Sequence, residues 1–242
     1  LEIDAYVCGE KESLRSLPME AGCARWSQER IVAMKTLLAA GCGGRTEIVR
    51  ELLARWRGEG NDDERTKWLR ELIDESVVVW YASGSGHADV VSLLLGVPGV
   101  NVNVVHSAHG DTALFQACQN GFSNVVRVLL AAGNVDINKQ ADEDDSFCPL
   151  FTACAQGHTE IVKLLLARKE IHVNQSSSYK GGTPLFVASL AGNTEIVQLL
   201  LKHAKIDVHK NSDGHSALGM AKQRNHHEIV RLLTRKITED SK

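Results

Sequence analysis

Residues 157–166 read GHTEIVKLLL, and close variants of this sequence recur along the chain. The clearest copies are GRTEIVRELL at 44–53, GHADVVSLLL at 86–95, GFSNVVRVLL at 121–130 and GNTEIVQLLL at 192–201. A degenerate copy begins at Gly9, and Asn225 replaces the glycine in the last copy. Successive copies begin 35, 42, 35, 36, 35 and 33 residues apart. A period in the thirties is typical of stacked supersecondary units, so the sequence predicts about seven such units rather than one globular core.

One unit, residues 182–214, shows the elements that each unit is expected to contain. Thr183 is a good N-cap and Pro184 suits the first helical position, so a helix begins here. Gly192 ends that helix because glycine readily adopts the left-handed conformation. The apolar spacing of the repeated sequence then predicts a second helix. An alternating segment and a turn complete the unit at residues 206–214, so each unit is a helix, a tight turn, a helix and an extended finger.

The motif TPLFVA at residues 183–188 is close to the TPLHxA motif of ankyrin repeats, and residues 135–138 match the closing strand of that repeat. The chain therefore resembles the ankyrin repeat family. The resemblance implies an all-α solenoid of helix–turn–helix units joined by finger loops or β-hairpins. Three units depart from it, since Phe115, Phe151 and Phe186 stand where the family has histidine. These phenylalanines can only pack where a histidine would hydrogen-bond the neighbouring turn.

We expect a single ankyrin-repeat domain over residues 1–242. Its parts, in chain order, are a degenerate N-terminal cap at 1–34, a second unit at 35–75 with an insert at about 55–65, internal repeats at 76–110, 111–145, 146–181 and 182–214, a C-terminal cap at 215–236 and a frayed tail at 237–242. The segment with the insert predicts either a helix over residues 64–74 or a longer loop in place of a finger. It is interpreted either as a tolerated surface insertion or as a unit-specific contact made by Trp56 or Trp68.

The composition sets limits on the partner. The formal net charge is −3, which gives no strong field for nucleic acid or a membrane surface. No apolar run approaches the roughly 20 residues of a membrane span. The six cysteines form no C-x-x-C pair, which favours free thiols in a reducing compartment. We therefore expect an intracellular protein, cytoplasmic or nuclear, with no nucleic acid partner and no membrane insertion; because it begins at Leu1, we expect a fragment of a larger protein.

No motif points to catalysis. His87, His158 and His226 follow the repeat glycine or its substitute, where a capping role in the turn is expected, and no second ligand cluster supports a metal site. The glycines of residues 40–46 lack the lysine, spacing and preceding strand of a phosphate-binding loop. There is no nucleophile elbow and no dinucleotide fingerprint. We therefore expect no enzyme activity, no catalytic residue, no cofactor and no metal.

The resemblance implies that a partner binds the concave face, which finger tips and first helices form. The matching positions in this sequence are Ala108, His109, Asp111, Gln119, Asn120, Asp144, Asp145, Phe147, Gln156, Tyr179, Lys180, Asp213, His215 and Arg224. Acids at residues 142–145 either stay solvated or bind a basic group of the partner. This face is acidic in its middle, so a protein or peptide with a basic segment is our sharpest hypothesis for the partner.

Two other functions fit the same sequence. The repeats could be the regulatory domain of a larger enzyme, channel or transcription factor, or a self-assembly module that pairs through a patch around Trp56 and Trp68. The resemblance also implies a modification, because ankyrin proteins can be hydroxylated on asparagine at the finger entry, where Asn103, Asn138 and Asn174 stand. The alternative role of these asparagines is to hydrogen-bond the turn.

Overall fold

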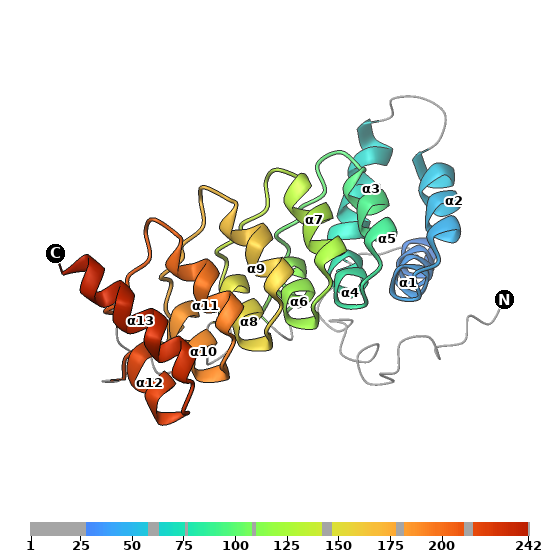
Figure 1. The fold of residues 1–242 in the computed structure, drawn as a ribbon. Coiled ribbons are helices and arrows are strands. Elements are labelled where there is room, and N and C mark those ends of the chain that lie inside the picture. Colours follow the sequence, from blue (N-terminus) through green and yellow to red (C-terminus); the bar gives the residue numbers. More distant parts are fainter. Residues whose placement is uncertain are drawn as a thin grey trace.

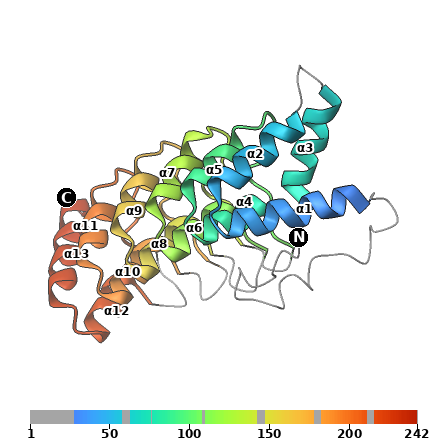
Figure 2. The same cartoon turned by 90° about the vertical axis from the view of Figure 1, so that its right-hand side faces the viewer.

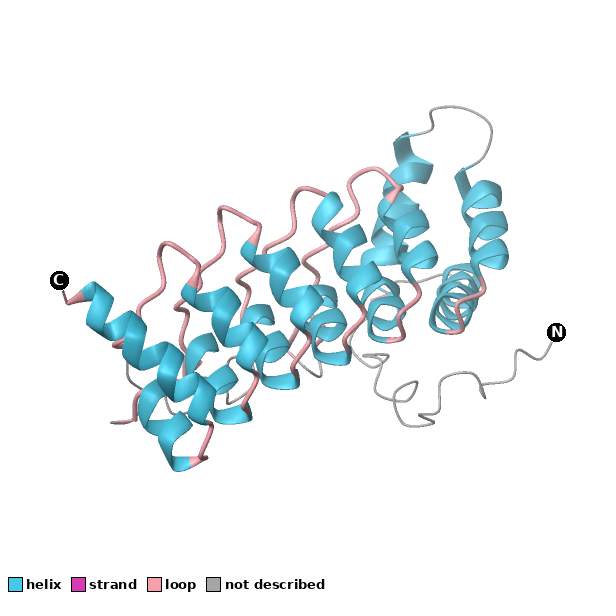
Figure 3. Ribbon diagram, viewed as in Figure 1, coloured by secondary structure: helices cyan, strands magenta, loops and turns pink. Residues whose placement is uncertain are grey.

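The structure, a computed structural model, describes residues 28–57, 63–75, 77–107, 110–141, 147–177, 182–210 and 215–241. Within these ranges helices are arranged in two rows, with one row stacked on the other (Figures 1 and 2). From α5 onward, described loop segments follow the second helices (Figure 3). Most of the N-terminal cap predicted at 1–34 lies outside the described residues.

The first helices of successive units form one continuous row. They are α1 (Gln28–Cys42), α4 (Val78–Gly84), α6 (Ala113–Asn120), α8 (Pro149–Gln156), α10 (Pro184–Ala191) and α12 (Ala217–Gln223), each packed against the next. The second helices form the other row, namely α2 (Thr46–Arg57), α5 (Ala88–Leu95), α7 (Ser123–Ala131), α9 (Thr159–Leu166), α11 (Thr194–Leu201) and α13 (His227–Asp240). Since each helix contacts its partner and its neighbouring units, the predicted all-α solenoid is confirmed.

A short finger follows the second helix of a unit. In the described part of the chain, backbone pairing is seen between Val105 and Thr112, where one antiparallel bridge closes the finger before α6. The amide of His106 donates to the carbonyl of Asp111 across the same finger, at 2.9 Å. The finger therefore places Asp111 and Thr112 directly at the start of the next first helix.

Residues 63–75 form a helix, α3 (Asp63–Glu75), so the structure selects the helix over the longer loop that the sequence also allowed. Leu69, Leu72 and Ile73 are completely buried, and α3 packs on α1, α2 and α4. Trp68 of α3 meets Trp56 of α2 edge to face, with ring centroids 5.9 Å apart. A whole helix thus occupies the place that a finger has in later units, and its buried side is part of the continuous core.

Two details of the predicted unit bounds differ from the structure. Helix α1 begins at Gln28, so the expected bound between residues 34 and 35 falls inside one helix. At the other end, α13 continues to Asp240, so most of the segment expected as a frayed tail is helical. The last turns of α13 carry ion pairs, Arg235 to Glu239 and Lys236 to Asp240, both at 2.8 Å. Such i,i+4 pairs stabilise exposed helix ends.

One repeated position of the first helices is occupied by small, fully buried side chains. Cys118 and Cys154 lie at the same position of successive first helices and are fully buried, and Ser83 and Ser189 occupy that position in two other units. Burial raises the pKa of the Cys118 and Cys154 thiols above their ordinary value, so both stay protonated. Cysteine and serine fit this position because their side chains are small and the first helices pack directly on one another.

The N-caps of the first helices differ in one unit. Thr112, Thr183 and Ser216 each accept a hydrogen bond from the amide three residues ahead, at 3.3, 3.1 and 3.0 Å. Cys148 has the same extended backbone but its side chain forms no cap. Burial is the main cause that raises the pKa of the Cys148 thiol, so its sulfur is neutral and a weak acceptor. One backbone amide at the start of α8 therefore lacks the side-chain acceptor that the other first helices have.

We expect Cys148→Thr to stabilise the protein by roughly 0.5–1 kcal/mol, because threonine restores the cap. Threonine fits, since Thr112 and Thr183 are as deeply buried at the same position. Urea unfolding of the variant should show a higher midpoint, and the reverse change Thr183→Cys should lower it by a similar amount. A lower midpoint for Cys148→Thr would mean that packing of the sulfur matters more than the cap.

Candidate partner-binding face

Tight turns between the two helices of four units are hydrogen-bonded to the unit before. The residue after the turn glycine, or after Asn225 in the last unit, bonds a carbonyl at the end of the preceding first helix. The pairs are His87 Nε2 with Cys42 O at 2.9 Å, His158 Nε2 with Gln119 O at 3.1 Å, His226 Nε2 with Leu190 O at 3.3 Å, and Asn193 Nδ2 with Cys154 O at 2.9 Å. The predicted turn role of these histidines is confirmed, and they hold adjacent units at a fixed spacing.

Fingers are tied together in the same stepwise way. The side chain of Asn138 donates to the carbonyl of Glu170 at 2.8 Å and accepts from the amide of His172 at 2.8 Å, one finger further on. Asn103 and Asn174 make the equivalent pairs of bonds to the next fingers. The turn-bonding role of the three asparagines is therefore confirmed, and each amide group has both of its polar atoms in use.

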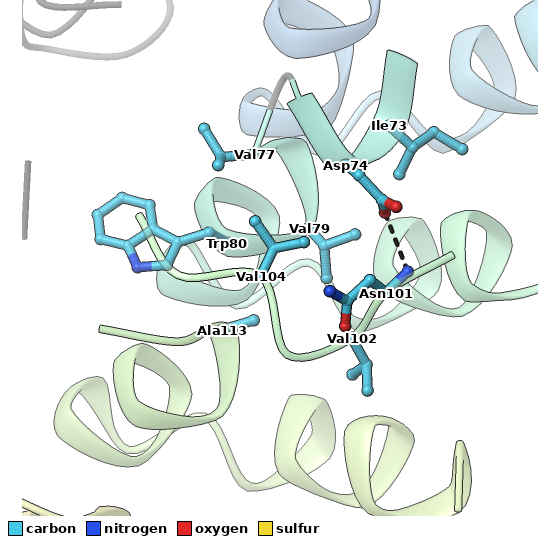
Figure 4. Close-up of a pocket in the computed structure, with 9 residues that line it drawn as sticks. All are labelled: Ile73, Asp74, Val77, Val79, Trp80, Asn101, Val102, Val104 and Ala113. Carbon is cyan, nitrogen blue, oxygen red and sulfur yellow. Dashed lines mark hydrogen bonds between the residues drawn. The ribbon is translucent and has the colours of Figure 1, made fainter. Parts of the chain in front are cut away.

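Helix α3 continues this ladder although it is not a finger. Asp74 Oδ1 accepts from the amide of Asn101 at 3.0 Å, which is the bond that an asparagine supplies in later units (Figure 4). Beside it lies a cavity of about 10 Å³, between Val79, Trp80 and Val104 (Figure 4). That volume is about the minimum that one water needs. The junction of α3 with the first finger is thus structural, and it holds no space for a ligand.

Aromatic side chains line the base of the fingers. Phe147 stacks on Phe151 with parallel rings whose centroids are 4.7 Å apart. In the next unit Gly182 replaces Phe147, and a β-carbon there would lie 3.3 Å from Phe151 and 3.4 Å from Phe186. The expectation that these phenylalanines pack where the family has histidine agrees with this arrangement. Phe147 is half-buried, so one side of its ring is supported by the scaffold and the other remains accessible.

Asp111 does not lie on the accessible surface that was predicted for it. Its side chain is buried, with 4% of its surface exposed. One carboxylate oxygen accepts from Trp80 Nε1 at 2.5 Å and the other from Gln116 Nε2 at 2.7 Å. The ring of His106 lies against Trp80, with centroids 4.4 Å apart. Asp111 therefore holds the finger to α4 and α6, and it is left out of the surface proposed below. Sequence reasoning missed Gln116, because only the folded unit brings it to Asp111.

Several other predicted residues do lie on the exposed ends of the first helices. Gln119 and Asn120 of α6 and Gln156 of α8 are exposed, and so are His215 and Arg224 beside α12. The amide of Asn120 also donates to the carbonyl of Gly84 at 3.0 Å, which orients it at the junction of two units. The remaining predicted residues, Ala108, His109, Asp144, Asp145, Tyr179, Lys180 and Asp213, lie outside the described residues.

The described face carries side chains that can contact a partner. Neutral amides at the ends of α6 and α8 can donate and accept hydrogen bonds, Phe147 offers an aromatic surface, and Arg224 offers a cation. In the described ranges no group of three histidine, cysteine or acidic side chains could hold a metal ion. Likewise, none of the helices described is both long and apolar enough to cross a bilayer.

The comparison with known proteins agrees with this architecture. A family model described as ankyrin repeats, in three copies, matches residues 36–141, 79–177 and 150–241. No curated protein matches the chain. Ankyrin repeats generally act as protein–protein interaction modules. Because the family model covers most of the sequence and the structure shows its stacked helix pairs and turn contacts, the chain belongs to the ankyrin repeat family.

Proposed function

We propose that this protein is an adaptor or scaffold that binds a partner protein or peptide on its concave face. The observation that carries the proposal is the exposed row formed by Gln119, Asn120 and Gln156 at the carboxyl ends of successive first helices. At the opposite end of α8, the half-buried ring of Phe147 adds an aromatic group. These side chains stand on a scaffold whose turns and fingers are hydrogen-bonded from unit to unit. A pre-ordered surface loses little conformational entropy on binding, so modest contacts suffice for affinity.

The proposed partner carries a basic segment. Asp144 and Asp145 end the fourth unit in sequence, one residue before Phe147 is reached, and an aromatic residue close to charge is a frequent hot-spot combination. Lys180 and Arg224 give the C-terminal part of the face a basic character, so an extended partner would be oriented along the solenoid. Buried free thiols such as Cys118 support an intracellular location, cytoplasmic or nuclear, since disulfides rarely form there.

The test compares capture of partners by the wild type and by an Asp144→Asn, Asp145→Asn, Phe147→Ser variant. We expect the variant to lose a partner that the wild type retains, and the wild-type affinity to fall as salt is raised from 50 to about 300 mM, because exposed charge pairs are screened. A matched variant, Glu195→Gln and Glu228→Gln, changes exposed acids on second helices and should bind like the wild type. Equal retention by all three proteins would exclude this face. Equal melting temperatures must accompany the comparison.

Self-assembly is the second candidate, and one observation favours it. Val32 of α1 and Ile48 of α2 have 60% and 41% of their surfaces exposed, at the N-terminal end of the described stack. Trp56 and Trp68, first considered for this role, are instead packed on each other and against the core. Sedimentation of the wild type and of Val32→Gln, Ile48→Gln from 1 to about 100 µM would decide this, because self-assembly predicts a concentration-dependent mass in the wild type alone. A regulatory role within a longer protein would instead appear as binding to its own flanking domains.

A further inference from the structure

Aromatic side chains occupy one repeated position of the first helices. The position lies three residues after the N-cap, and in four successive units it holds Trp80, Phe115, Phe151 and Phe186. In the last unit the same position of α12 is Gly219. Because each of these helices packs on the next, the four side chains form a row along the solenoid that ends before Gly219.

The first three side chains of the row are buried, and the unit that follows helps to cover them. Their exposed fractions are 9%, 7% and 9% for Trp80, Phe115 and Phe151. Beside Trp80 lies Asp111, directly before the next N-cap, and its carboxylate accepts from the indole Nε1. Gly182 has the same place beside Phe151, where an added β-carbon would lie only 3.3 Å from the ring. Both rings are therefore covered by the start of the next first helix.

Phe186, the last ring of the row, is less well covered. It is half-buried, and Gly182 of its own unit lies beside it. In the last unit, the residue before the N-cap is His215 and the residue at the aromatic position is Gly219, and both are exposed. The unit that follows Phe186 thus contributes no ring at the aromatic position.

The backbone does not require a glycine at residue 219. Gly219 is helical rather than left-handed, and glycine weakens a helix relative to alanine because it loses more conformational freedom. Apart from its own helix and chain neighbours, an added β-carbon would meet one atom of the described residues within 4 Å, the capping Ser216 Oγ at 3.3 Å. Phe115 and Phe186 coexist with the same kind of cap, so the cap does not exclude a ring. The position beside Phe186 is open because residue 219 has no side chain.

The surface around Gly219 is apolar on α10 and basic on α12. Leu190, four residues on from the last ring and on the same side of α10, is half-buried. Residues 217–226 contain Lys222 and Arg224 and no acid, and both of these side chains are exposed. Lys222 is three residues from Gly219, so it lies on the same side of α12. This surface fits an apolar ring that has negative charge beside it.

We propose that an aromatic side chain of the partner fills the place at Gly219 and packs on Phe186. An acidic residue next to it in the partner's sequence then meets Lys222 and Arg224. The site belongs to the C-terminal part of the concave face, so it rests on the proposed function and names the chemistry that this part of the face selects. Opposite charges fix the register of the bound segment.

An aromatic ring suits the site better than an aliphatic side chain does. Within this chain, Phe147 stacks on Phe151 with parallel rings whose centroids are 4.7 Å apart, so a ring at the repeated position can take a second ring on its face. Such aromatic pairs are stabilised beyond the burial of their area, and aromatic anchors are frequent hot spots of interfaces.

The first experiment adds the peptide Ac-Ala-Phe-Glu-Glu-Ala-NH2 to the ¹⁵N-labelled protein. We expect amide shifts at residues 186–190 and 217–224. A peptide with alanine in place of phenylalanine should bind roughly tenfold more weakly, because it loses the burial and stacking of the ring. A peptide with two lysines in place of the glutamates should also bind more weakly, because its charges repel those of α12. Equal binding of either control, or no shifts at these residues with the first peptide, would overturn the proposal.

Variants of residue 219 test whether the open position is the site. Gly219→Phe supplies a ring from the chain itself and should abolish the shifts, whereas Gly219→Ala leaves most of the space open and should keep them. The control Gln198→Phe adds a ring at an exposed position of α11 and should also keep them. A urea midpoint at least as high as that of the wild type shows that Gly219→Phe is folded. Shifts that survive in folded Gly219→Phe, or that disappear in Gly219→Ala, would overturn the proposal.

Capture of a partner separates this site from the proposed function itself. Loss of the same partner from Gly219→Phe and from the Asp144→Asn, Asp145→Asn, Phe147→Ser variant would support both. A partner that Gly219→Phe keeps and the triple variant loses would overturn the aromatic site and leave the concave-face function standing. A partner that both variants keep would overturn both.

Discussion

Replacing Gly192 by alanine is expected to lower the free energy of unfolding by about 3 kcal/mol. Gly192 has φ of +78°, a conformation that costs an L-residue roughly 1–2 kcal/mol. A β-carbon there would also lie 2.6 Å from the ring of His226, and forcing such overlap in a packed site costs roughly 1–3 kcal/mol. The ring cannot simply move away, because its Nε2 is hydrogen-bonded to the carbonyl of Leu190.

Urea unfolding of a matched series separates the two causes. Gly133 has φ of +81° but no atom within 4 Å of an added β-carbon, so Gly133→Ala should cost only the conformational part, about 1–2 kcal/mol. Gly157 has φ of +78° and an ordinary contact of 3.4 Å, so Gly157→Ala should resemble Gly133→Ala. In the background of His226→Ala, the extra cost of Gly192→Ala should disappear. Equal losses for all three glycines would show that contact with His226 contributes nothing.

The second prediction concerns the buried carboxylate of Asp111. Changing Asp111 to alanine is expected to destabilise the protein by about 3 kcal/mol, because it removes the acceptor from two donors, Trp80 Nε1 and Gln116 Nε2. A buried donor left without a partner costs roughly 1–3 kcal/mol, and Trp80 is buried. Thermal unfolding and the indole N–H resonance of Trp80 both report the change.

Control variants distinguish this structural role from partner binding. Asp111→Asn keeps one carbonyl oxygen as an acceptor, so it should cost about 1 kcal/mol and leave the indole resonance close to its original position. Gln119→Ala changes an exposed residue of the same helix pair and should alter stability by less than about 0.5 kcal/mol. If Asp111→Ala were as stable as the wild type, the carboxylate would not be needed to hold the finger.

Much of the fold could be predicted because each unit repeats the same local signals. Thr183 and Pro184 mark where a first helix begins, and Gly192 marks where it ends; both features depend on the conformational preferences of single residues. The helix in the insert was also predictable, since Trp68, Leu69 and Leu72 share one side of it. Stacking of the units followed from the fact that no single pair of helices can bury its own apolar side.

Other features could not be predicted because they depend on contacts between units. Val77 has φ of +47° before α4, an uncommon conformation for a β-branched residue, and no local signal indicates it. Asp74 accepts a hydrogen bond from the amide of Asn101, as asparagine side chains do from the fingers of later units. Because a helix replaces the finger in this unit, the repeat pattern of the sequence does not identify Asp74. In both cases the position of α3 against the next unit decides the geometry.

The sequence by itself determined the architecture of this protein, because repeat period, caps and apolar spacing are local and recur in successive units. It also determined the candidate face, through positions that the resemblance assigned. Only the tertiary structure decided which of those positions are accessible: Asp111 is buried by Trp80 and Gln116, while Gln119 and Gln156 remain exposed. It also decided that Arg168 donates to the carbonyl of Leu130 in the preceding unit, since the two residues meet only after the units have stacked.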